Sequence, residues 1–102
     1  MTRADISDGY QLVQSNHAVA DFAYENPQKF REWKETSNYI ISLQIPDENK
    51  LISLYEKLKD QGAHATLFRE PDINDEATSF AVFGTPEIRK QTSNLKLSLK
   101  KI

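Results

Sequence analysis

The chain contains no cysteine and only two histidines among its 102 residues. Without cysteine there is no disulfide, no thiolate metal site and no cysteine nucleophile, and a histidine-based metal site has few donors. We therefore expect neither a metal nor a cofactor. Because the segment after Met1 also lacks the apolar stretch of a signal peptide, the sequence favours a cytoplasmic protein.

Other absences narrow the class of protein further. No apolar run approaches the ~18–20 residues that a membrane span needs, and with three glycines the chain has no glycine-rich phosphate loop. The formal charge of −2 lacks the basic surplus of a protein that binds nucleic acid mainly through phosphates. Basic residues nevertheless gather near the C-terminus, which allows a local basic patch: Arg89, Lys90, Lys96, Lys100 and Lys101.

What is present indicates one globular domain spanning residues 1–102, at 38% hydrophobic and 27% charged residues. Strand patterns alternate with helical patterns, and this alternation predicts an α/β fold, a three-layer α/β/α arrangement with a mixed sheet of about four strands. The predicted strands are residues 1–6, 39–45, 63–69 and 77–83.

Two of these segments carry stronger expectations. Residues 39–45 form a run of β-branched and aromatic side chains, which predicts a central strand buried on both faces. The helix expected from about residue 9 to residue 24 has apolar residues at near-helical spacing, which we expect to pack against the sheet. These residues are Leu12, Val13, Val19, Ala20 and Ala23.

The segment from Arg3 to Ala18 is the most informative part of the chain. It reads R-x-D-I, then a turn containing Gly9, then Q-x-x-H-A. Gln14 and His17 are three residues apart, so they share one face near the start of the helix. The segment resembles the opening of type II peptidyl-tRNA hydrolases, which read R-x-D-[LI], a glycine-containing turn and Q-x-x-H-A.

The resemblance continues in order along nearly the whole chain. Residues 40–54 resemble the family pattern V-V-L-K-A-P-D-E-x-x-L-x-x-L, and residues 82–97 resemble L-G-I-G-P…G-x-L-K-L. It implies a sheet with three parallel strands and one antiparallel strand, and hydrolysis of the ester that joins a peptide to tRNA. The implied partners are tRNA or peptidyl-tRNA, without a membrane.

A homodimer is predicted as well, because related hydrolases commonly pair and because a sheet this small has a limited core. Apolar residues available for such a contact are Phe30, Trp33, Leu95, Leu97 and Leu99.

The resemblance also implies site residues. The family loop D-A-G-x-T-x-x-x-P-G-x-x-T matches residues 70–78, with Glu70 at the Asp and Thr78 at the final Thr. The middle Thr and the Pro-Gly turn have no counterpart. The implied catalytic residues are His17, Glu70 and Thr78, and the implied substrate-binding residues are Arg3, Asp5, Tyr10 and Gln14.

One departure bears on activity. The family turn is rich in lysine, G-K-G-K, and Tyr10 stands where the last of these lysines would be. Ester hydrolysis needs a polarised carbonyl and an activated water, so the missing cation predicts weak or absent hydrolysis. Two functions stay open: hydrolysis of peptidyl-tRNA or a related ester, and a non-catalytic or repurposed module that binds an RNA end or a protein.

Several residues have a second interpretation. His17 either faces the substrate or packs under the sheet edge with its nitrogens bonded to backbone, Gln14 either contacts substrate or is solvated, and His64 is interpreted as structural. An acidic stretch within residues 70–76 either binds a hard cation or is a solvated turn, and the missing calcium-loop spacing favours the turn. We expect any site where the helix carrying Gln14 meets the loop at residues 70–78, because both follow strand ends.

Overall fold

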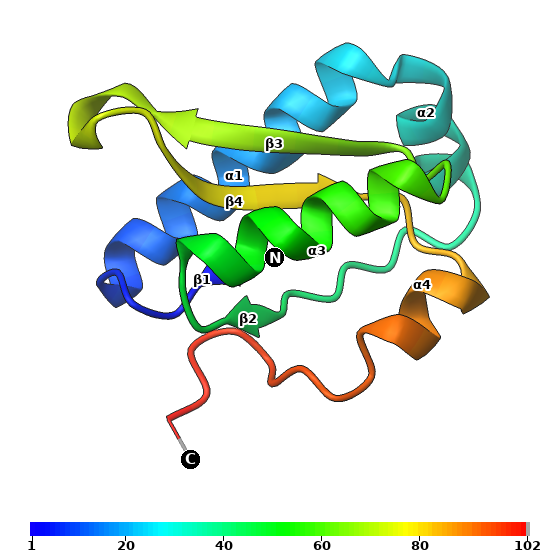
Figure 1. The fold of residues 1–102 in the computed structure, drawn as a ribbon. Coiled ribbons are helices and arrows are strands. Elements are labelled where there is room, and N and C mark those ends of the chain that lie inside the picture. The colour runs from blue at the N-terminus through cyan, green and yellow to red at the C-terminus, as the bar shows by residue number, and fades with distance from the viewer. Residues whose placement is uncertain (102) are drawn as a thin grey trace.

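The computed structural model describes residues 1–101. Within this range the chain forms four α-helices, a short 3-10 helix and a four-stranded sheet, which confirms the predicted α/β fold (Figure 1). The elements are β1 (Thr2–Arg3), α1 (Asp8–Glu25), α2 (Pro27–Glu35), β2 (Gln44–Ile45), α3 (Glu48–Asp60), β3 (Ala65–Glu70), η1 (Pro71–Ile73), β4 (Glu76–Val82) and α4 (Pro86–Gln91). No helix in residues 1–101 has both the length and the apolar character required to cross a bilayer.

The strands lie in the order β2-β1-β4-β3. β1 pairs in parallel with β2, and β4 is antiparallel to both of its neighbours, β1 and β3. Three strands therefore point one way and β4 points the other, as the resemblance implied. Helix α1 lies on one face of the sheet and α3 on the other, which gives the three layers (Figure 1).

The prediction for residues 39–45 was wrong in position and extent. Only Gln44–Ile45 forms a strand, and it lies at the edge of the sheet rather than at its centre. Tyr39 and Ile40 are 81% and 70% exposed. The strand beside β2 is β1, which contains only two residues, Thr2–Arg3, instead of the six expected. The ladder between β1 and β2 therefore cannot extend further.

The expected buried face of α1 was also wrong. Leu12, Val13 and Val19 point to solvent, whereas Gln11 and Gln14 are buried against the sheet. The α1 side of the sheet is polar: it buries Thr2, Thr66, Thr78 and Ser79, which need hydrogen-bonding partners rather than apolar contacts. The apolar core lies on the α3 side and contains Ile45, Leu51, Leu58, Ala65, Ala77, Phe80 and Ile88.

The start of α1 is positioned by a short connection from β1. Ala4 makes the last bond of the parallel pair, its N–H donating to the Ile45 carbonyl at 2.8 Å. Four residues later the helix begins, with the Ser7 hydroxyl accepting from the Tyr10 N–H at 3.4 Å. The N-terminus of α1 therefore lies at the carboxyl ends of β1 and β2.

Candidate functional site at the carboxyl ends of the parallel strands

Gln14 is the centre of a buried hydrogen-bonded group. Its side chain is fully buried, and its Nε2 donates to Glu70 Oε1 at 2.8 Å. Its Oε1 accepts from Thr78 Oγ1 at 2.7 Å. One side chain thus joins α1 to the end of β3 and the start of β4. The alternative of a solvated Gln14 is excluded by this burial.

A β-bulge brings Thr78 into that group. Phe68 pairs with Ser79 and Arg69 pairs with Ala77, so Thr78 has no partner across the β3–β4 ladder. Bulges change the direction of side chains and are common near active sites. Here Ala77 belongs to the core on the α3 side while Thr78 reaches Gln14 on the α1 side. Sequence spacing alone gave no signal for this bulge.

Arg3 is held by two acidic side chains. Its Nε and Nη2 donate to the two carboxylate oxygens of Asp5 at 2.8 and 2.9 Å, and its Nη1 donates to Glu76 Oε1 at 2.7 Å. The hydrogen bonds to Asp5 are the largest cause of the raised pKa of Arg3, and the same contacts lower the pKa of Asp5. Because the Arg3 side chain is only 9% exposed and its charge is matched, it serves as a tie between β1 and β4.

This pairing predicts how stability changes with pH. Asp5→Asn should lower the free energy of unfolding by about 1 kcal/mol at pH 7, since the Asp5 side chain is 41% exposed and the pair is partly screened. The folded pKa of Asp5 lies below its ordinary 3.8, so the stabilisation is complete above pH 3.8 and disappears as the pH falls through the folded value. Urea unfolding at pH 7 and pH 3 measures this. The exposed Asp60→Asn is the control, and an equal deficit at both pH values would contradict the prediction.

Tyr10 lies one helical turn before Gln14 and faces the acidic loop. Desolvation raises the pKa of its phenol, and the nearby carboxylates of Glu70 and Asp72 raise it further. At neutral pH Tyr10 is therefore an uncharged hydrogen-bond donor. It can polarise a carbonyl but supplies no positive charge.

His17 lies on the same side of α1 as Gln14, one turn further along, and is exposed. Its ring stacks on Phe68 of β3 with centroids 4.5 Å apart and planes 9° apart. Within residues 1–101 its nitrogens make no hydrogen bond, so the alternative in which backbone groups satisfy them does not hold. The stacking fixes the ring while both nitrogens stay available.

The acidic loop does not form a cation site among residues 1–101, where no three acidic or histidine side chains converge. Glu70 instead binds Gln14 and accepts from the Asp72 N–H at 3.4 Å, and Glu76 binds Arg3. The carboxylates of Glu70 and Glu76 are thus used as internal hydrogen-bond acceptors, whereas Asp72 and Asp75 are exposed.

The C-terminal segment also lies at the carboxyl ends of β1 and β2. It closes one side of an open cavity of about 460 Å³, and Lys101 Nζ lies 2.6 Å from Asp8 Oδ1 at the start of α1. The residues that line the cavity are Ala4, Asp5, Gln44, Pro46, Asn94, Leu95, Lys96 and Lys100. The sequence showed that these lysines cluster but not where they lie.

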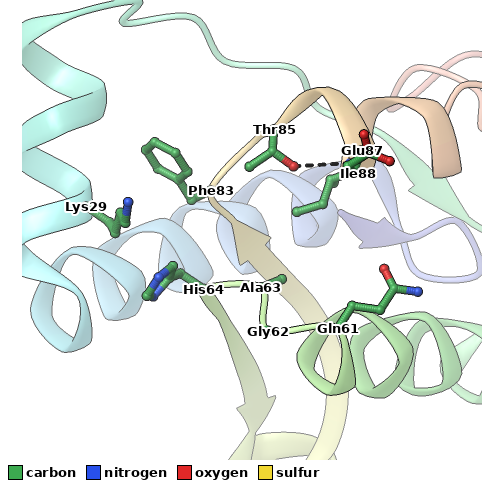
Figure 2. A pocket seen from close by; sticks show the side chains of 9 residues that line it. All are labelled: Lys29, Gln61, Gly62, Ala63, His64, Phe83, Thr85, Glu87 and Ile88. Carbon is green, nitrogen blue, oxygen red and sulfur yellow. Dashed lines mark hydrogen bonds between the residues drawn. The ribbon is translucent and has the colours of Figure 1, made fainter.

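A second hollow, of about 230 Å³, lies at the opposite edge of the sheet, where β3 begins and β4 ends (Figure 2). Lys29 Nζ stands 4.9 Å from the centroid of the Phe83 ring, and Thr85 Oγ1 accepts from the Ile88 N–H at 3.2 Å. His64 lines this hollow and is therefore not brought to Gln14.

The fold and this geometry define an open α/β protein with a polar cluster at the carboxyl ends of its parallel strands, the edge where such sheets hold ligands. The family model described as Peptidyl-tRNA hydrolase PTH2 matches residues 3–98. The chain therefore belongs to this family, which confirms the resemblance seen in its sequence. Membership indicates a peptidyl-tRNA hydrolase-like function and peptidyl-tRNA as the class of substrate. No curated protein matches the chain.

Proposed function

We propose that this chain binds the acceptor end of peptidyl-tRNA in the cytoplasm and hydrolyses its ester slowly. The observation that carries this proposal is the Gln14 cluster, in which Gln14 bonds to Glu70 and Thr78. His17, one turn further along α1, stacks on Phe68 of β3, the strand that ends at Glu70. In the reaction a water oxygen adds to the ester carbonyl and the bond to the ribose oxygen breaks. His17 transfers the proton between the water and the leaving oxygen, and the Tyr10 phenol donates to the developing oxyanion.

The low rate follows from the charges around the site. The guanidinium of Arg3 is matched by two carboxylates, Tyr10 is neutral, and Lys101 is paired with Asp8. No residue in this set offers an unmatched positive charge to the oxyanion. Electrostatic stabilisation of that charge is usually the largest part of such catalysis.

A second function, binding of tRNA without hydrolysis, is favoured because the polar groups of the Gln14 cluster bond to one another. Gln14 and Thr78 are fully buried and satisfy each other, and Glu70 is nearly buried. In this arrangement the Gln14 cluster holds α1 against the sheet and does not itself contact substrate. The groups left to contact RNA are His17 and Tyr10. Such a protein would hold a tRNA end without cleaving it.

Release of peptide from peptidyl-tRNA, measured together with binding of deacylated tRNA, separates the two functions. Slow turnover that falls at least tenfold in His17→Ala, with tRNA binding kept, supports the hydrolase. Binding with no turnover above the uncatalysed rate supports the binding module. A protein that neither binds nor cleaves overturns both. Asn16→Ala, an exposed change on the same helix, is the control.

We also propose that the protein forms a homodimer. The exposed Leu12, Val13 and Val19 on the outer side of α1 supply apolar surface that a second copy could cover. Light scattering at micromolar concentration is expected to give twice the mass of the chain, and Val13→Glu is expected to shift the mass toward one chain. A single-chain mass for the wild type contradicts this proposal.

A further inference from the structure

We propose that the C-terminal segment, residues 94–101, builds a phosphate-binding subsite that takes the RNA backbone of the substrate. The subsite is the cavity at the carboxyl ends of β1 and β2, where Lys96 and Lys100 form part of the wall. This inference rests on the proposed function, because the phosphates are those of the bound tRNA. It assigns to these lysines a role in holding substrate, separate from the residues that act on the ester.

The segment is fixed by hydrogen bonds to the edge strand. Leu43 and Leu97 form an antiparallel bridge, and the Gln44 N–H donates to the Lys96 carbonyl at 2.9 Å. The Gln44 side chain donates to the Lys100 carbonyl at 2.8 Å. The backbone is thus anchored on both sides of the bridge, so the two lysines are held beside the cavity by bonds that do not use their ammonium groups.

The charge in this cavity is positive. Within residues 1–101 neither Lys96 nor Lys100 has an acidic partner within 4.0 Å. The acidic residue in the wall, Asp5, is already bound in both carboxylate oxygens by Arg3. Two lysines without an acidic partner in this range line one open cavity, and such a pair suits a phosphodiester, which accepts hydrogen bonds and carries negative charge.

The position of the cavity fits a substrate that also reaches the ester site. Asp5 lines the cavity and also bonds to Arg3, and α1 begins three residues after Asp5. A strand of RNA whose phosphate lies between the lysines therefore runs toward the helix that carries Tyr10 and His17. Lys101, paired with Asp8, neutralises the acidic residue that would otherwise repel this backbone.

Binding of deacylated tRNA at several salt concentrations tests the subsite, with fluorescence anisotropy as the readout. Each phosphate contact on a single strand contributes about 0.7 to the slope of log affinity against log salt, so Lys96→Ala with Lys100→Ala should reduce the slope by about 1.4. Between 50 and 200 mM salt the wild type should lose about sevenfold more affinity than the double variant. The pair Lys57→Ala with Lys59→Ala on α3 removes the same charge at another surface and should keep the wild-type slope.

The outcomes separate the subsite from the proposed function. Wild-type protein that does not bind tRNA overturns the function. Wild-type binding with an unchanged slope in the Lys96 and Lys100 variant overturns the subsite alone. A peptidyl-adenosine ester, which has no backbone phosphate, should be cleaved equally by the wild type and the double variant. If the alanine variant loses its circular dichroism signal, Lys96→Gln with Lys100→Gln keeps the side-chain length and gives the same comparison.

Discussion

Replacing Gln14 by alanine is expected to destabilise the protein by about 2–6 kcal/mol, because each buried polar group left without a partner costs ~1–3 kcal/mol. The substitution leaves two such groups, Glu70 Oε1 and Thr78 Oγ1, at the junction of α1, β3 and β4. It also opens a cavity in a fully buried position. Since small domains are stable by only ~5–15 kcal/mol, this is a large fraction of the total.

Urea unfolding followed by circular dichroism measures the change. Asn16→Ala, two residues along the same helix and exposed, should alter stability by less than about 0.5 kcal/mol. Adding Thr78→Val to Gln14→Ala should cost less than the sum of the two single changes, because the Thr78 hydroxyl no longer lacks a partner. A Gln14→Ala loss as small as that of the control would show that the cluster does not stabilise the fold.

Tyr10→Lys is expected to raise the rate of peptidyl-tRNA hydrolysis by about 10²-fold, because one electrostatic contact to the developing oxyanion is typically worth ~3–4 kcal/mol, or 10²–10³ in rate. The new ammonium group would stand one turn before Gln14, on the helix face toward the acidic loop. Glu70 and Asp72, whose carboxylates already influence Tyr10, would hold it in place while reducing part of its charge. The expected gain is therefore at the lower end of that range.

The readout is the turnover number for peptide release, with tRNA affinity measured separately. Tyr24→Lys is the matched control, since it makes the same chemical change on the same helix at a position 88% exposed and near the opposite end. Any gain in the control reports general attraction of tRNA by added charge. Robust wild-type turnover that His17→Ala abolishes and Tyr10→Lys leaves unchanged would show that the missing cation does not limit the reaction.

The order of elements was readable from the sequence because local signals are strong. Asp47 and Thr85 cap the starts of α3 and α4, and each side chain accepts from a backbone N–H of the first turn. The run Q-x-x-H-A placed Gln14 and His17 on one helix face, and the in-order match to the family patterns indicated four strands. These features depend on residues close together in the chain.

Which residues are buried could not be predicted from the sequence in the same way. Periodicity assumes that apolar residues face the core, yet α1 turns Gln11 and Gln14 inward and Leu12 outward. The polar groups can be buried because strands distant in sequence supply their partners, as Thr78 does for Gln14. The apolar run at residues 39–45 likewise became an edge, because β1, the strand of the sheet that pairs with it, is short and the C-terminal segment adds only an isolated bridge at Leu43 on its other side.

By itself the sequence determined the class of fold, the family pattern and the absence of a lysine at Tyr10, since these depend on residue identity and spacing. Only the tertiary structure decided that Arg3 is neutralised by Asp5 and Glu76, that a bulge aims Thr78 at Gln14, and that the C-terminal lysines reach the same edge of the sheet. The physical reason is that hydrogen bonds and charge pairs depend on distances between atoms, and residues far apart in the chain meet only once the sheet has formed.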